Sequence, residues 1–217
     1  MRGCTLLLVA AVLITLPVVA SAAPSVFGPT GLVTIPTADV VGMMHWSAGI
    51  TAVELDRGND LTLICGNFGI TPNLELGVTR EKPEGHSAET LLNAKYRALQ
   101  PILGGTSLSI GAIDATDQLD STPYVVLSHD IGAGYIFKEG EITSPQIHVG
   151  IGGGMLDGIF AGVSATVKDK ISLMAEYDSE DINLGVRFPL APKLEGGVYA
   201  FDGLDDLGFG LNFSSPW

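Results

Sequence analysis

The chain has 217 residues, with 24 acidic and 11 basic side chains and a formal net charge of -13. This acidic balance argues against nucleic acid as a partner, because proteins that bind nucleic acid present basic surface to the phosphates. The length suits one β-barrel or one large globular domain.

Residues 1–22 have the features of a secretory signal peptide. Arg2 precedes an apolar run that Pro17 interrupts, and residues 20–22 (Ala-Ser-Ala) form a small-x-small cleavage site. A retained membrane anchor is the alternative, but the run is short and no charged stop follows it. After cleavage Cys65 is the single cysteine of the chain, which excludes an intramolecular disulfide.

Residues 23–42 form an entry segment that contains several prolines and precedes the strands. Residues 28–39 read Gly-Pro-Thr-Gly-Leu-Val-Thr-Ile-Pro-Thr-Ala-Asp, and the prolines exclude a helix. We expect residues 28–38 to lie outside the wall of the domain that follows, so that their deletion spares folding.

Residues 43–217 contain twelve runs in which apolar and polar or small residues alternate. In the last run Leu207, Phe209 and Leu211 fall on one face, and Gly208 and Gly210 on the other. A period of two indicates strands with one apolar face, and turn residues separate the runs. The runs span residues 44–55, 59–69, 73–81, 89–99, 107–115, 122–130, 146–153, 159–167, 171–178, 182–188, 194–201 and 207–214.

These runs predict an all-β fold, an antiparallel up-and-down transmembrane β-barrel of about twelve strands in the outer membrane. An even number of strands joined by short turns closes antiparallel, and no run after residue 22 is long enough for a membrane-spanning helix. The last strand then pairs with the first. A secreted or periplasmic β-sandwich that binds a ligand or partner is the alternative. Residues 131–145 form either an extra hairpin or a long loop, and we favour the loop.

Charged residues within the strands lie opposite the apolar face. A charge on the lipid face near the bilayer midplane costs about 2–4 kcal/mol, so these side chains are expected to face the lumen and pair there across strands. The predicted lumen-facing charges are Glu75, Lys95, Arg97, Glu176, Arg187 and Glu195. Aromatic residues near the ends of the runs are candidates for interfacial girdles: Trp46, Tyr96, Tyr124, Tyr177, Phe188, Tyr199 and Trp217.

The sequence predicts no catalytic, cofactor-binding or metal site. Ser128, His129 and Asp130 are consecutive, but neighbours on a strand point to opposite faces. His148 faces inward, within reach of Ser128 or Asp130, yet a lone interior histidine is more often simply hydrogen-bonded. No Cys/His cluster suggests a metal. We therefore expect that the protein is not an enzyme and needs no cofactor.

Residues 28–38 resemble the opening of the YjbH-like outer-membrane β-barrel proteins. Residues 69–77 (Gly-Ile-Thr-Pro-Asn-Leu-Glu-Leu-Gly) and residues 173–187 are similar to barrel runs of that family. The chain is far shorter than the large members and has no lipobox. The resemblance implies a structural or export-linked role in exopolysaccharide production or secretion, and it offers no catalytic residues. Outer-membrane lipid and the barrel-assembly machinery are the expected partners of such a barrel, and polysaccharide or export proteins those that the resemblance adds.

Overall fold

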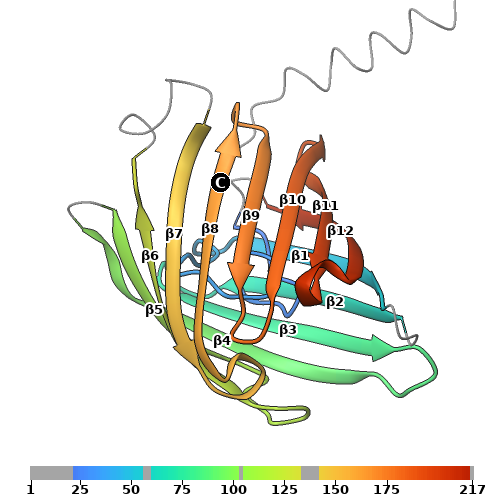
Figure 1. Cartoon of the computed structure of the whole chain (residues 1–217). Helices are drawn as coiled ribbons and strands as arrows, with labels where there is room; N and C mark the ends of the chain where they lie inside the picture. Colours follow the sequence, from blue (N-terminus) through green and yellow to red (C-terminus); the bar gives the residue numbers. More distant parts are fainter. Residues whose placement is uncertain (1–21, 56–59, 103–104, 133–141, 216–217) are drawn as a thin grey trace, which may run out of the picture.

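The computed structural model describes residues 22–55, 60–102, 105–132 and 142–215. In these residues twelve antiparallel strands form a closed barrel, with neighbours in chain order hydrogen-bonded and β1 paired with β12 (Figure 1). The signal peptide assignment remains a prediction, since only Ala22 of residues 1–22 lies inside the described ranges.

The strands follow the predicted runs closely. They are β1 (Trp46–Glu54), β2 (Leu61–Gly69), β3 (Leu74–Pro83), β4 (Glu89–Ile102), β5 (Thr106–Ile113), β6 (Thr122–Asp130), β7 (Ile142–Gly152), β8 (Gly158–Val167), β9 (Ile171–Tyr177), β10 (Ile182–Ala191), β11 (Leu194–Phe201) and β12 (Asp206–Ser214). Two short 3-10 helices, η1 (Gly154–Leu156) and η2 (Asp202–Leu204), lie in connections. Neither is long and apolar enough to cross a membrane.

The seam between the first and last strands distinguishes a barrel from a sandwich. Ile50 faces Leu211 and Thr51 faces Gly210 in an antiparallel register that runs along both strands. The predicted up-and-down barrel is therefore confirmed, and the alternative of a β-sandwich is wrong. Residues 142–145 belong to β7, so the loop predicted for residues 131–145 ends earlier, and its central part lies outside the described residues.

The apolar face of the wall points outward. Along β12, Leu207, Phe209, Leu211 and Phe213 are 40–52% exposed, and exposed aliphatic residues recur on every strand. A continuous apolar band of this kind would be costly in water, whereas hydrocarbon solvates it. The exterior is thus the surface of a membrane-embedded barrel.

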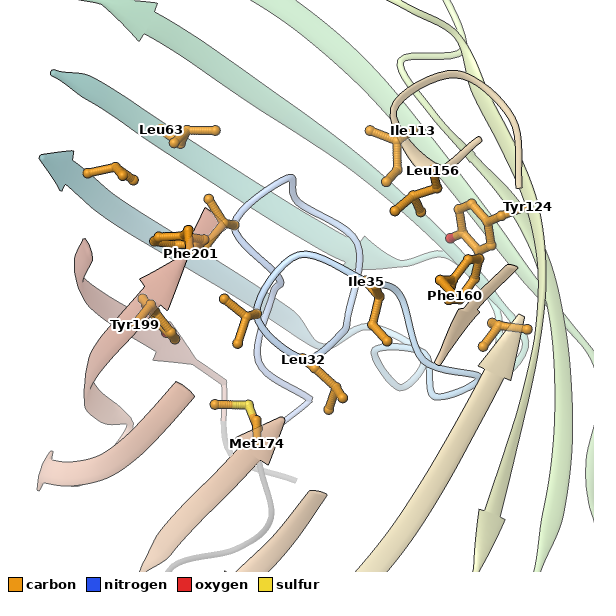
Figure 2. Packing of buried hydrophobic residues seen from close by; sticks show 14 of the residues in the cluster. Leu32, Ile35, Leu63, Ile113, Tyr124, Leu156, Phe160, Met174, Tyr199 and Phe201 are labelled. Atoms are coloured by element: carbon orange, nitrogen blue, oxygen red, sulfur yellow. The ribbon is translucent and has the colours of Figure 1, made fainter. Parts of the chain in front are cut away.

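Residues 23–42 occupy the lumen. We call this segment the plug, and Figure 1 shows it in blue inside the wall. The sequence did not predict this position: the segment is separate from the wall, as expected, but it is packed within it. Figure 2 shows Leu32 and Ile35 of the plug surrounded by side chains of the strands. The buried apolar cluster joins Val26, Leu32, Val33, Ile35 and Ala38 of the plug to Val53, Leu63, Ile113, Tyr124, Val126, Leu156, Phe160, Met174, Tyr199 and Phe201.

Two wall glycines provide the room that the plug needs. A Cβ atom at Gly162 would lie 2.6 Å from the Leu32 Cδ1 atom, and one at Gly185 would lie 2.7 Å from the Val33 Cγ2 atom. Both distances are below normal carbon contacts. The lumen side of β8 and β10 therefore needs glycine at these positions because the plug approaches the backbone closely.

The aromatic residues divide between the two faces of the wall. Trp46 and Tyr177 are exposed at strand ends, where an interfacial girdle is expected, and Tyr96 is exposed in the middle of β4. Tyr124 and Tyr199 are instead buried in the lumen cluster, so their proposed girdle role is wrong. Alternation places both on the lumen side of their strands. Phe188 is half-buried, and Trp217 lies outside the described residues.

Both ends of the barrel wall lie at one rim, because the strand number is even. At this terminal rim β1 begins and β12 ends, and the tight turns from Val167 to Ile171 and from Ala191 to Leu194 lie there too. Outer-membrane barrels place their short turns on the periplasmic side. We therefore expect the terminal rim to face the periplasm, with the connection from β6 to β7 as its longest one.

Candidate functional site

The plug is held first by an ion pair on adjacent strands. Glu75 of β3 faces Lys95 of β4 in the register, with 3.7 Å between the Lys95 Nζ atom and the Glu75 Oε1 atom. Glu75 accepts hydrogen bonds from the Thr30 backbone N–H (2.9 Å), the Thr30 hydroxyl (2.6 Å) and the Val41 N–H (2.7 Å). Lys95 donates to the carbonyl oxygens of Thr30 (2.6 Å) and Thr37 (3.4 Å). The pair thus binds the plug both at Thr30 and at residues 37–41.

Glu176 of β9 holds the centre of the plug from another part of the wall. Its carboxylate accepts hydrogen bonds from the N–H groups of Val33 (2.9 Å) and Thr34 (2.6 Å) and from the Thr34 hydroxyl (2.5 Å). The Asn183 amide donates to the same carboxylate at 3.2 Å. Hydrogen bonds to a charged acceptor are stronger than neutral ones, so Glu176 is a firm anchor for residues 33–34.

Arg187 of β10 binds plug carbonyl oxygens on the same side of the lumen. It donates to Gly31 (3.1 Å), Pro24 (2.9 Å) and Leu32 (2.5 Å), and its Nε–H donates to the Tyr199 hydroxyl at 3.1 Å. The guanidinium carbon also lies 5.8 Å from the centre of the Tyr199 ring. A planar group with five donors suits several converging carbonyl oxygens better than a lysine would.

Neutral side chains complete the contacts of the plug. The Ser109 hydroxyl donates to the Ala38 carbonyl at 2.7 Å, and the Ser128 hydroxyl accepts from the Ala38 N–H at 2.8 Å. Ser128 also lies 2.7 Å from the Nδ1 atom of His148, whose Nε2 atom lies 3.2 Å from the Ser164 hydroxyl. His148 therefore meets Ser128, and both ring nitrogens are engaged in a hydrogen-bonded chain that ends on the plug backbone.

The six charges predicted for the lumen do not all contact the plug. Glu75, Lys95, Glu176 and Arg187 are buried and bind it directly. Arg97 is half-buried and donates to the carbonyl of Pro72, in the turn between β2 and β3. Glu195 is half-buried and lines a cavity at the terminal rim.

That cavity has a volume of about 550 Å³ and lies between the plug and the wall. The plug contributes Ala23, Thr30 and Asp39, and the wall contributes hydroxyl-bearing residues of β7, β8 and β9 together with Arg187 and Glu195. No group of three or more His, Cys, Asp or Glu residues in the described part of the chain is arranged to hold a metal ion. In the described part of the chain the site is therefore a plugged lumen whose plug is bound by buried charges, with a polar cavity at the terminal rim.

A closed antiparallel barrel with an apolar exterior and buried charges inside defines an outer-membrane β-barrel protein. No family model and no curated protein matches the chain, so neither comparison supports the YjbH-like resemblance.

Solved structures with similar folds are outer-membrane barrels. The KdgM porin superposes with a TM-score of 0.55 at 10% identity, covering 79% of this chain and 99% of that one. The KdgM porin in complex with disordered oligogalacturonate gives the same TM-score and coverage at 12% identity. Omp33 of Acinetobacter baumannii has a TM-score of 0.48 at 9% identity, covering 80% of this chain and 98% of that one. At such low identities the likeness to the porin concerns the fold.

Proposed function

We propose that this protein is a plugged outer-membrane barrel with a structural or export-linked role, and that it is not an open porin. The observation that carries the proposal is the plug itself, whose backbone is bound by Glu75 and Lys95 on one part of the wall and by Glu176 and Arg187 on another. A twelve-stranded barrel encloses a narrow lumen, and a folded segment across it leaves little path for solutes.

The finer assignment to exopolysaccharide production or secretion rests on the resemblance of residues 28–38. In this structure the same residues form the centre of the plug, so the motif is the part of the chain that closes the lumen. A porin that shares the fold has been solved with oligogalacturonate, which makes a carbohydrate a reasonable cargo or ligand to test here. Outer-membrane lipid surrounds the wall, and the barrel-assembly machinery and export proteins are proposed partners.

Single-channel recording tests the plugged state. The purified protein should give little steady conductance in planar bilayers, whereas a chain lacking residues 24–41 should give stable steps. The deletion leaves every hydrogen bond between strands in place and lets water solvate the four charges, so the wall should still close. Glu180→Gln, in an exposed connection, is the matched control and should behave as wild type. Large, stable steps from the wild-type protein would contradict the proposal.

A second experiment tests the export role. Cells that lack the gene should secrete less exopolysaccharide, and the full-length protein should restore it. Unchanged secretion in the deletion strain would remove the polysaccharide assignment and leave the structural one.

A further inference from the structure

The predicted signal-peptide cleavage site lies at the cavity of the terminal rim. Ala22 and Ala23 both line this cavity, and Ala23 is only 2% exposed. The two residues that follow the cut are already fixed, since the Ala23 carbonyl accepts from the Gly31 N–H at 3.1 Å and the Pro24 carbonyl from Arg187 at 2.9 Å. Cleavage after Ala22 would therefore place the new chain end inside the barrel.

Cleavage changes the charge at this position. Hydrolysis of the bond between Ala22 and Ala23 adds one water: the Ala22 carbonyl becomes a carboxylate that leaves with the signal peptide, and the Ala23 amide becomes a primary amine. An α-amine has a pKa near 7.7–8.0, so it is mostly protonated at neutral pH. In the uncleaved chain the Ala23 N–H bonds to none of the described residues, so this nitrogen can donate to a new acceptor.

Glu195 is the carboxylate best placed to receive this cation. Arg187 faces Gly197 in the register, and Glu195 lies two residues along β11 on the same lumen face, so Glu195 is close to the guanidinium that holds Pro24. Glu195 also lines the cavity, and among the described residues the cation that acts on it there is the single guanidinium of Arg187. The other two carboxylates there are less suitable, because Asp39 already faces the charges of Lys95 and Arg97, and Asp169 is exposed in a turn.

We propose that removal of the signal peptide creates a binding partner for the lumen: the α-ammonium group of Ala23 pairs with Glu195 in the terminal-rim cavity and secures the start of the plug. The uncleaved chain has no cation at this position, so the contact exists only in the processed protein. The proposal depends on cleavage after Ala22 and is independent of whether the lumen conducts.

The chemical reactivity of the α-amine tests the pairing. Mass spectrometry of the N-terminal peptide first establishes that the membrane-inserted protein begins at Ala23. The folded protein in detergent is then labelled at pH 7 with an amine-reactive ester, and modification of the N-terminal peptide is followed with time. An ion pair that raises the α-amine pKa by one unit makes the reactive neutral form about tenfold rarer. Wild type should therefore label about tenfold more slowly than Glu195→Gln, and Glu180→Gln should match wild type.

A displaced N-terminus separates pairing from simple burial. A refolded chain that carries Gly-Ser before Ala23 moves the ammonium group away from Glu195, so in this background Glu195→Gln should not change the labelling rate. A mature N-terminus at another residue would overturn the proposal. Equal labelling of wild type and Glu195→Gln would also overturn it, as would an equal effect of Glu195→Gln in both backgrounds.

Discussion

Glu176→Ala is the change that most directly tests the anchoring of the plug. The substitution removes the acceptor of the Val33 and Thr34 N–H groups, which are buried in the lumen. Each buried N–H left without a partner costs about 1–3 kcal/mol, so the two together amount to about 2–6 kcal/mol if the plug stays in place. Removal of the carboxylate, which is itself desolvated in the lumen, offsets part of this free-energy cost. If the plug leaves the lumen, water solvates the two N–H groups and the cost is smaller.

The expected outcome is a destabilised plug within an intact wall. At about 2–4 °C per kcal/mol for a chain of this size, the lower bound of the cost, about 2 kcal/mol, corresponds to a fall of about 4–8 °C in the thermal midpoint. Added protease should cut residues 23–42 faster in Glu176→Ala than in wild type. Glu176→Gln, which keeps one acceptor oxygen, should fall between the two, and Glu180→Ala should change neither quantity. If Glu176→Ala has the same thermal midpoint as wild type and is cut by protease at the same rate, Glu176 does not anchor the plug.

Three further outcomes follow from the wall and its connections. Leu173→Arg puts a charge on the lipid face and should lose far more assembled protein than Ser172→Arg, whose side chain enters the polar cavity; equal heat-modifiable bands on a gel would reverse the face assignment. Cysteines at Ile50 and Leu211, in a background without other cysteines, should crosslink across the seam in membranes, and no crosslink would contradict closure. Burial raises the pKa of Asp114, but hydrogen bonds from the Leu119 and Gln118 N–H groups outweigh it, and the net pKa lies below its usual value. The connection between β5 and β6 should therefore keep its stability above about pH 4 and lose it as the pH falls further, and Asp114→Asn should flatten this dependence of protease resistance on pH.

The wall could be predicted from the sequence because its rule is local. Leu207, Phe209 and Leu211 point to lipid wherever the strand pairs, and the period of two shows this directly. The same rule places Glu75 and Lys95 on the lumen face, whereas the register that sets them opposite each other comes from the pairing of β3 with β4. Strand ends, such as the start of β7 at Ile142, depend on contacts across the sheet that periodicity does not contain.

The plug could not be predicted from the same rule, since its partners are distant in the chain. Val33 and Thr34 bond to Glu176 across 143 and 142 residues, and no periodicity connects such positions. One signal was present: Leu32, Val33 and Ile35 are too apolar for a segment outside the barrel. The small residues on the lumen side of the wall, Gly162 and Gly185 among them, were a second sign that something occupies the interior.

The span of the plug contacts has a consequence for the order of assembly. The plug leaves the export machinery before any strand, and its bonds to Glu75 close loops of 45 and 34 residues, so this half of its site forms early. Its bonds to Glu176 and Arg187 close loops of more than 140 residues and wait for the second half of the wall. Residues 23–42 thus contact both halves of the finished wall, and the plug completes these contacts only once β9 and β10 have formed.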